Sequence, residues 1–422
     1  MKKLLALVLC LLMVVPFAAT AEDVTITLWT YPIGSWANES TVNEIIANFN
    51  AVHPEIKVNV QYLDYQSGDD QVTSAIEAKT TPDIIFEGPE RLVANWGANG
   101  KMLDISDLWT EETAADIAAA SPTMLATCTG ADGKVYLYPL CMTTHCMVID
   151  QAAFEAAGAM QYVNLETRTW TNEQFAKACE ALVNAGYAIP GIVYCGGQGG
   201  DQGTRALAYN LYNATFTNDA KTEYTMNSEA GVKSLQQLVD WVNDGLLVSD
   251  PGIVAGDAIA LFCNGTTQMS FCWNAALLET NKQTLADGVK PLAMAFPSED
   301  GVPVLDGGVW GFGLFNNGDE AKVAAAKEFI KFVCDDAVQG PKSAYATGYF
   351  PVKASFGDIY TGTEKEGNAD YAVFSPYFGG IYQTAPNWTV QRTEWWNLLQ
   401  RIFAGGDVAT EANVYAANVN VK

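Results

Sequence analysis

Three charged residues follow a short apolar run in the first quarter of the chain. The segment TPDIIFEGPERLVANWG, residues 81–97, has the pattern of a buried strand and then places Glu87, Glu90 and Arg91 around a Gly-Pro pair. Carboxylate and guanidinium groups form strong, directional hydrogen bonds, so the three residues together could bind a polar molecule. A helix cap at Glu90 and a surface ion pair at Arg91 would explain the same residues equally well.

The surrounding pattern predicts a parallel sheet whose carboxyl edge carries these charged residues. Strands with alternating or apolar sequence and helices with amphipathic spacing follow one another three times. This order is typical of an α/β fold in which helices cover a parallel sheet, and ligands bind such sheets beyond the carboxyl ends of their strands. We expect strands at 24–30, 56–63 and 84–86, and helices at 43–51, 72–79 and from Pro89 onward.

A second α/β region is predicted after residue 134, and its elements continue to the end of the chain. Its glycine-rich loop, Gly196 to Asp201, lacks both the Lys-Ser/Thr of a P-loop and the spacing of a dinucleotide fingerprint, which argues against phosphate binding there. There is no internal repeat and no low-complexity linker, so two lobes with several chain crossings are expected. Strands are predicted at 134–138, 189–195 and 266–273, and helices at 171–186, 228–245, 255–264, 320–337, 395–404 and 411–419.

Length and charge limit the possible functions. The chain has 422 residues, which favours two domains, and 49% of them are hydrophobic. Residues 1–21 have a positive start, an apolar run and an Ala-Thr-Ala cleavage site, which is typical of a signal peptide. Without them the chain has 21 basic and 48 acidic side chains, a formal charge of −27. This charge argues against nucleic acid and anionic membrane surfaces as partners.

The signal peptide predicts a chain that is exported from the cytoplasm, into a periplasm or to the cell surface. In an exported chain a cysteine could carry a lipid anchor or form a disulfide. Cys10 follows Leu9, where a lipobox needs a small residue, so we expect no lipid anchor. Eight further cysteines lie mostly among apolar residues, and we favour buried thiols over disulfides for them. The run from Cys141 to Cys146 around His145 matches no zinc pattern, and both histidines, His53 and His145, are interpreted as structural.

Several short segments in order resemble the extracellular solute-binding proteins of ABC sugar importers, the group that includes the maltose-binding protein. The resemblance covers nearly all of the chain after the predicted signal peptide. The segments that carry it are ITLW (26–29), HPEIKV (53–58), PDIIF (82–86), GKVYLYP (133–139), Asn264-Gly265 through Met269 to Trp273, Gly307-Gly308 and GYFPV (348–352).

The resemblance implies a two-lobed α/β fold of the periplasmic-binding-protein type II class, with the ligand in a cleft between lobes joined by a hinge of several crossings. One lobe would hold residues 22–135 and 292–345, and the other 136–291 and 346–422. Closure of such a hinge buries the ligand. The protein would act without a cofactor or metal, would not be an enzyme, and would deliver its ligand as a monomer to the membrane permease of an ABC importer.

The resemblance also implies individual binding residues. Glu90 and Arg91 occupy the positions of an acid–arginine pair that bonds sugar hydroxyls in the family. Glu87 replaces a tryptophan that contacts the sugar, while Trp273 and Trp388 match or lie near aromatic residues of the family site. Thr143 lies near a family carboxylate, so that contact would be absent or supplied elsewhere.

A carbohydrate, most simply an oligosaccharide, suits these residues chemically. Sugars have apolar faces that pack on aromatic rings and hydroxyl groups that bind charged planar side chains. Any of these aromatics could instead belong to a core; that alternative is favoured for Trp29, Trp241 and Trp310, whereas loop or strand-end positions favour the site for Trp36, Trp273 and Trp388. The predicted ligand-binding residues are Tyr31, Trp36, Glu87, Glu90, Arg91, Trp273, Trp310, Tyr349 and Trp388.

Two alternative functions remain open from the sequence. The same fold could bind sn-glycerol 3-phosphate or a polyamine; a phosphate needs a cluster of cations, and only Arg91 is clearly placed at a strand end, so an uncharged ligand is favoured. A polyamine would use Glu87 and Glu90 with an aromatic box. A secreted glycoside hydrolase needs two carboxylates, which 48 acidic residues supply trivially.

Overall fold

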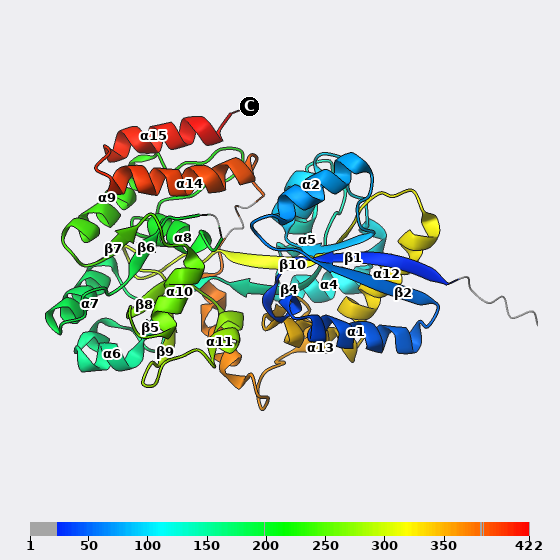
Figure 1. Cartoon of the computed structure of the whole chain (residues 1–422), viewed down its shortest axis with the longest axis horizontal. Coiled ribbons are helices and arrows are strands. Elements are labelled where there is room, and N and C mark those ends of the chain that lie inside the picture. Colours follow the sequence, from blue (N-terminus) through cyan, green and yellow to red (C-terminus); the bar gives the residue numbers. More distant parts are fainter. Residues whose placement is uncertain (1–22, 198, 380–381, 383, 422) are drawn as a thin grey trace, which may run out of the picture.

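The computed structural model describes residues 23–197, 199–379, 382 and 384–421, and these form two lobes side by side (Figure 1). The predicted signal peptide and the cleavage site therefore lie outside the described residues. No helix in the described part of the chain has both the length and the apolar character that crossing a membrane requires.

The first lobe is built on a six-stranded sheet with the order β11-β4-β10-β3-β1-β2. The three N-terminal strands are parallel, with Val24 opposite Ile56 and Leu28 opposite Ile84, which confirms the predicted parallel sheet. Strand β10 runs antiparallel to both β3 and β4. The strands are β1 (Val24–Thr30), β2 (Ile56–Tyr62), β3 (Ile84–Glu87), β4 (Tyr138–Thr144), β10 (Gly307–Leu314) and β11 (Phe350–Pro351).

Helices and helical turns cover this sheet, and the interior is apolar. They are η1 (Gly34–Ala37), α1 (Glu39–Val52), α2 (Gly68–Ala78), α3 (Pro89–Arg91), η2 (Leu92–Gly97), η3 (Ser106–Leu108), α4 (Glu111–Ala120), α5 (Met124–Cys128), α12 (Glu320–Asp335), α13 (Gln339–Thr347) and η5 (Ala354–Phe356). The core of the lobe includes Leu28, Phe86, Phe312 and Phe329, all fully buried.

The second lobe has two small sheets, β8-β5-β9 and β6-β7. Its strands are β5 (Cys146–Asp150), β6 (Ile192–Tyr194), β7 (Val248–Asp250), β8 (Met269–Trp273) and β9 (Pro291–Met294). Its helices and helical turns are α6 (Gln151–Ala156), η4 (Ala159–Tyr162), α7 (Asn172–Asn184), α8 (Gln202–Asn210), α9 (Glu229–Asn243), α10 (Ala255–Cys263), α11 (Ala275–Asn281), η6 (Glu366–Tyr377), α14 (Trp388–Phe403) and α15 (Val408–Val419).

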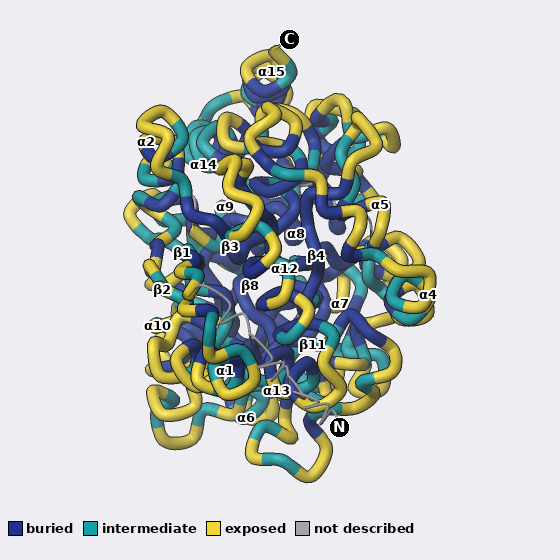
Figure 2. The backbone as a smooth tube through the Cα atoms, turned by 90° about the vertical axis from the view of Figure 1, so that its right-hand side faces the viewer, coloured by how far each residue is buried: buried dark blue, intermediate teal, exposed yellow. Residues whose placement is uncertain are grey.

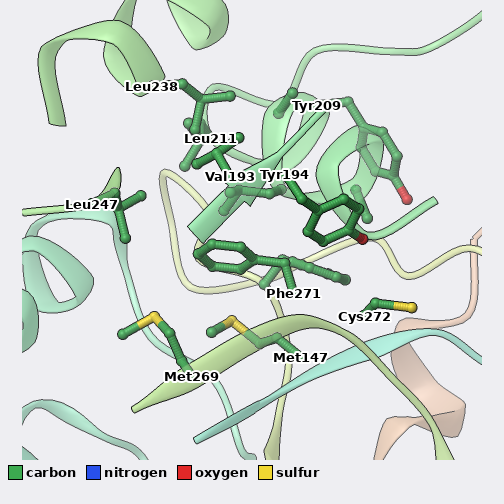
Figure 3. Packing of buried hydrophobic residues seen from close by; sticks show 14 of the residues in the cluster. Met147, Val193, Tyr194, Tyr209, Leu211, Leu238, Leu247, Met269, Phe271 and Cys272 are labelled. Carbon is green, nitrogen blue, oxygen red and sulfur yellow. The ribbon is translucent and has the colours of Figure 1, made fainter. Parts of the chain in front are cut away.

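Local sequence explains where several of these helices begin. Thr171 and Gln174 form the capping box that starts α7, and Ser228 caps α9 through the backbone N–H of Gly231. Figure 3 shows the buried contact that these helices cover, with Phe271 of β8 lying beneath Val193 and Tyr194 of β6. Helix α14 begins seven residues before the predicted start at residue 395, and this shift makes Trp388 its first residue.

The chain passes between the two cores three times, as expected for a hinge of several crossings. One crossing joins β4 to β5, a second joins β9 to β10, and a third follows β11. The first two lie together, because His145 N–H donates to the Asp306 carbonyl, and Leu305 N–H beside the second crossing donates to the carbonyl of Tyr377 at the end of η6. Figure 2 shows buried chain through the centre of the molecule. The cores place Tyr136 and Cys141 with the first lobe and Leu292 and Met294 with the second, so the crossings at His145 and Asp306 come later in the chain than the predicted lobe boundaries after residues 135 and 291.

The cysteines of the described residues are eight free, buried thiols. All eight lie within the two apolar cores, for example Cys179 in the second lobe and Cys334 in the first. Burial raises the pKa of Cys141 and of Cys272 to about 12, so both remain protonated thiols near neutral pH. The structure therefore agrees with the interpretation of these cysteines as small core residues.

Candidate functional site between the lobes

A cavity of about 170 Å³ opens between the two lobes, next to the chain crossings. The first lobe contributes the carboxyl ends of β1 and β3 and part of β10, and the second contributes the beginnings of α8 and α14. Its walls are polar and aromatic rather than aliphatic. The principal side chains that line it are Tyr65, Glu90, Arg91, His145, Asp201, Gln202, Arg205, Asn274, Trp310, Tyr349, Trp388 and Arg392.

Arg91 is the central charged residue of the first-lobe wall. The predicted turn is present: Gly88 is the N-cap and Pro89 the first residue of α3, so the chain turns sharply after β3. The Nε of Arg91 donates to Oδ1 of Asp69 at 2.6 Å, and Nη1 donates to Oε1 of Glu87 at 2.8 Å. The Tyr31 ring lies 4.9 Å from the guanidinium carbon and adds a cation–π contact.

The charges around Arg91 shift the pKa values of its partners in opposite directions. Burial, together with the neighbouring carboxylates Glu90 and Asp69, raises the pKa of Glu87 to about 8 despite its pairing with Arg91. Burial alone would also raise the pKa of Asp69, but hydrogen bonds and attraction from Arg91 hold it below its usual value. Glu90 meets Arg91 only at 3.5 Å, so its carboxylate is the one in this wall with the most capacity for a ligand.

The second-lobe wall carries a second arginine–carboxylate cluster that sequence reasoning missed. Asp201 precedes α8 and binds Arg205 one turn later, and it also binds Nη2 of Arg392 from α14 at 3.3 Å. Arg205 donates further from Nε to the hydroxyl of Tyr382 at 2.9 Å. The sequence placed only Arg91 clearly at a strand end, whereas Arg91, Arg205 and Arg392 all line the cavity in the described part of the chain, and each is bound by at least one carboxylate.

Two tryptophans line the cavity with their rings held by other side chains. Trp310 of β10 stacks on Tyr349, with ring centroids 4.7 Å apart and an interplanar angle of 15°. Trp388 lies over Arg205, whose guanidinium carbon is 4.9 Å from the ring centroid. Both tryptophans therefore present rigid aromatic surface, which costs little side-chain entropy on binding.

Gly308 makes room for Trp310 on strand β10. The two residues share a face of the strand because they are two positions apart. A Cβ atom at Gly308 would lie 1.9 Å from Cη2 of the indole, far closer than two non-bonded carbon atoms can approach. The absence of a side chain at Gly308 therefore lets the indole fold back along the strand at the cavity wall.

Five of the nine predicted binding residues line the cavity: Glu90, Arg91, Trp310, Tyr349 and Trp388. Two others, Tyr31 and Glu87, do not line it but contact Arg91 from behind. Glu90 and Arg91 follow a strand of the parallel sheet, and this position predicted their place at the carboxyl edge of the sheet, where the cavity lies. Trp310, for which a core position was favoured, lies on the cavity because it is near the start of β10, directly after the chain crossing at Asp306.

Trp36 and Trp273 lie in the cores instead. Trp36 is on η1, which folds back over the sheet so that the indole packs on Phe86 and Phe312. Trp273 ends β8 as predicted, but its ring points into the second lobe, where Nε1 donates to the hydroxyl of Tyr371 at 2.7 Å. Both are at most 1% exposed. Position in a loop or at a strand end does not reveal the direction in which a side chain points.

The missed residues left weak signals in the sequence. Asp201 and Arg205 are an i, i+4 pair after a glycine-rich loop, which is a common surface pattern. Gly200 has a φ of +77°, a left-handed conformation that favours glycine, and it places the start of α8 at the cavity. Arg392 lies 191 residues from Asp201, so no local pattern connects them.

Comparisons with known proteins agree with this architecture. The chain is similar over 94% of its length to a solute-binding protein of an ABC transporter from Thermotoga lettingae, bound to α-D-tagatose, with a TM-score of 0.75, 18% identity and 99% of that chain covered. It is similar to the GacH receptor of Streptomyces glaucescens, solved unliganded and with acarbose (TM-score 0.75, 16% identity, 94% and 97% covered). It is also similar to the maltotriose-bound MalE domain of Bdellovibrio bacteriovorus (TM-score 0.71, 16% identity, 93% and 99% covered). At these identities the likeness establishes the two-lobed fold.

A curated relative matches a much smaller share of the chain. An uncharacterized lipoprotein from Streptomyces antibioticus is 26% identical over 154 residues, which are 36% of this chain and 33% of the relative. The chain thus matches about a third of that protein's length. Because the relative is a lipoprotein, the expectation that this chain lacks a lipid anchor remains a prediction.

The sequence model of one family matches the chain over residues 34–340, which include the first two of the three chain crossings and most of the cavity wall. Together with the two lobes, the hinge and the cavity between them, this match shows that the chain belongs to the bacterial extracellular solute-binding proteins, a family of binding proteins that act outside the cytoplasm.

Proposed function

We propose that this protein captures a carbohydrate, most simply an oligosaccharide, in the cavity between its lobes and delivers it to the permease of an ABC importer. The observation that supports this proposal most is that each of the two opposing walls combines at least one arginine fixed by ion pairs with a tryptophan fixed by contacts to its ring. Arg91 and Trp310 come from one side, and Arg205, Arg392 and Trp388 come from the other. This combination suits a ligand with apolar ring faces and many hydroxyl groups.

The charge balance of the walls favours an uncharged ligand over a phosphate. Arg91 is bound by Asp69 and Glu87, and Arg205 and Arg392 share Asp201. A phosphate would have to displace these carboxylates or lie beside them. A neutral hydroxyl group can instead add a hydrogen bond to a charged pair without disturbing it. Similar proteins that were solved with tagatose, acarbose and maltotriose support the same ligand class.

Capture would proceed by closure of the lobes around the hinge, without catalysis. The cavity is walled from both lobes, so movement of one lobe relative to the other would open or enclose the ligand. Glu90 and Asp201 both line the cavity, and a pair of acids is also what a glycoside hydrolase would need. Assays for sugar turnover therefore belong with every test of binding.

A thermal-shift panel tests the proposal. Purified protein without residues 1–21 is heated with glucose, galactose, maltose, maltotriose, cellobiose, xylobiose, sn-glycerol 3-phosphate and spermidine. A ligand of the folded state adds about 2.7 kcal/mol of stability at a hundredfold excess over its Kd. We expect a shift with one class of sugar and no sugar cleavage. A shift only with the phosphate or the polyamine, or cleavage of the sugar, would contradict the proposal.

A further inference from the structure

His145 lies at the floor of the cavity, between the lobes. It is the single residue between β4 and β5, so it occupies a chain crossing of the hinge. Its side chain lines the cavity, and the residue is 9% exposed. The structural role expected for this histidine from the sequence does not account for a place on the cavity wall.

Asp306 lies directly behind His145 on the neighbouring crossing. The backbone N–H of His145 donates to the carbonyl of Asp306 at 2.9 Å, which fixes the two crossings against each other. Nδ1 of His145 lies 3.7 Å from Oδ1 of Asp306. Both atoms are buried, and neither has a hydrogen-bond partner. Two buried polar atoms of complementary type thus face each other just beyond hydrogen-bond distance.

The other polar groups of Asp306 already have partners. Its Oδ2 accepts from the hydroxyl of Tyr382 at 2.8 Å, and its backbone N–H donates to the hydroxyl of Tyr209 at 3.2 Å. The Tyr382 hydroxyl in turn accepts from Nε of Arg205, which links Asp306 to the second-lobe wall. Oδ1 is therefore the oxygen of this carboxylate that remains for the imidazole.

We propose that Asp306 holds His145 in the tautomer with its proton on Nδ1, so that Nε2 faces the cavity as a hydrogen-bond acceptor for a ligand hydroxyl. The inference rests on the proposed function for the identity of that hydroxyl. Shortening the 3.7 Å separation by about 0.5 Å would bring Nδ1 within hydrogen-bond distance of Oδ1. The bond would remove the desolvation cost that two unpaired buried groups otherwise impose.

The tautomer decides what the cavity floor can bind. The hydrogen bond made by one ring nitrogen fixes the proton of the other. With the proton on Nδ1, Nε2 carries a lone pair and accepts from a hydroxyl or an N–H, but it cannot donate. Thr143, two residues before His145, lies near the position of a carboxylate in the family that the sequence resembles. His145 would supply a hydrogen-bond acceptor at this end of the site in place of that carboxylate. Asp306 is then a positioning residue, and His145 a ligand contact.

Nuclear magnetic resonance of the ligand-free protein tests the positioning. The chain contains only two histidines, so ¹⁵N-histidine labelling gives two imidazoles whose long-range ¹H–¹⁵N correlations report their tautomers. His53 lies on the first lobe, where its ring stacks on Phe49, and it serves as the internal reference. We expect a His145 signal of the Nδ1–H tautomer at pH 8. A signal of the Nε2–H tautomer would overturn the proposal.

Two variants separate positioning from general structure. Asp306→Asn keeps an oxygen for Tyr382 but loses the carboxylate, and we expect His145 to lose its tautomer preference. Tyr382→Phe removes the other bond to Asp306 and should leave the His145 tautomer unchanged. Thermal unfolding of both variants shows that they are folded before the spectra are compared. An unchanged His145 signal in folded Asp306→Asn would overturn the role of Asp306.

The contact with ligand is tested by adding a sugar that shifts the thermal midpoint in the panel above. We expect the His145 resonances to move on saturation and those of His53 to stay. A sugar that binds by calorimetry but leaves His145 unmoved would overturn the contact and leave the proposed function intact. The tautomer measurement uses ligand-free protein, so its result does not depend on whether any sugar binds.

Discussion

The Nε of Arg91 donates to Oδ1 of Asp69 at 2.6 Å, and Nη2 donates to Oδ2 of the same carboxylate at 3.1 Å. This bidentate pair joins α3, which follows β3, to the first turn of α2, and the side chain of Arg91 is only 5% exposed. A guanidinium fixed in this way can donate its remaining hydrogen bonds to a ligand with little loss of side-chain entropy. Asp69 is therefore expected to position Arg91 for the ligand, although it does not line the cavity itself.

Substitution of Asp69 tests this positioning. We expect Asp69→Asn to weaken carbohydrate affinity about tenfold to a hundredfold, because loss of a partner to a buried charge costs on the order of 2–5 kcal/mol and the partial exposure of Asp69 reduces that cost. Titration calorimetry measures the change. The adjacent Asp70 is exposed and provides the matched control, Asp70→Asn, for which affinity should be unchanged. Equal affinities in both variants would show that Arg91 does not need Asp69.

Gly308 offers a test of the aromatic wall that adds only a methyl group. Gly308→Ala should displace the indole of Trp310 and weaken sugar binding about tenfold, or about 1.4 kcal/mol, a typical worth of a placed aromatic contact. The strand itself tolerates alanine because the φ of Gly308 is not positive. Gly256→Ala on α10 is the control, since a Cβ there meets nothing within 4 Å. Unchanged affinity in Gly308→Ala would mean that Trp310 does not contact the ligand.

Trp273 and Trp388 should respond differently to the same substitution. Trp273→Ala opens a hole in the second core and should cost about 3–5 kcal/mol of unfolding free energy. Trp388→Ala removes a partly exposed ring at the cavity and should mainly raise the Kd for the sugar. Urea unfolding and calorimetry on both variants separate the two effects. A stable Trp273→Ala protein with lost affinity would return Trp273 to the binding site.

Glu87 should make stability fall as pH rises. Its pKa is raised from the ordinary glutamate value to about 8 in the folded protein, so between about pH 4.5 and 8 the folded state holds more protons than the unfolded state. The unfolding free energy contributed by this group is thus fully present below pH 4.5 and is lost as pH rises through 8. Urea unfolding from pH 5 to 9 measures the slope.

Glu87→Gln should flatten that slope relative to the unsubstituted protein, whatever its effect on absolute stability. Glu77→Gln, at an exposed position of α2, is the control and should keep the slope. Parallel pH profiles for the unsubstituted protein and Glu87→Gln would show that Glu87 has no raised pKa.

Sequence patterns were sufficient where the site depends on one strand and the turn after it. The run from Ile84 to Pro89 defines a buried strand, a cap and a helix start, and the edge of a parallel sheet then places Glu90 and Arg91 on the cavity. The same reasoning found the three parallel strands of the first lobe and the strand that ends at Trp273. It placed a strand at 134–138, where the structure has β4 at Tyr138–Thr144, and it did not predict β10. Periodicity and helix caps depend only on residues close together in the sequence, so they can be predicted without knowledge of the tertiary structure.

Patterns failed where the site depends on tertiary direction. Asp201 meets Arg392 across 191 residues, and Tyr349 meets Trp310 only because β11 and β10 both flank β4. Trp36 was expected at the cavity from its loop, yet η1 turns it into the core. The hinge residues His145 and Asp306 are neighbours only because two chain crossings lie side by side. The sequence around either residue does not predict this contact.

The most direct test of the account is calorimetric titration of the unsubstituted protein, Glu90→Ala and Arg91→Ala with the panel sugar that gives the largest thermal shift. Arg91→Ala leaves Glu87 and Asp69 without their cation, and Glu90→Ala removes the carboxylate with the most capacity for a ligand. We predict that each substitution lowers affinity by on the order of 2–5 kcal/mol while the protein stays folded. Unchanged affinity in both folded variants would contradict a carbohydrate site between the lobes at Glu90 and Arg91.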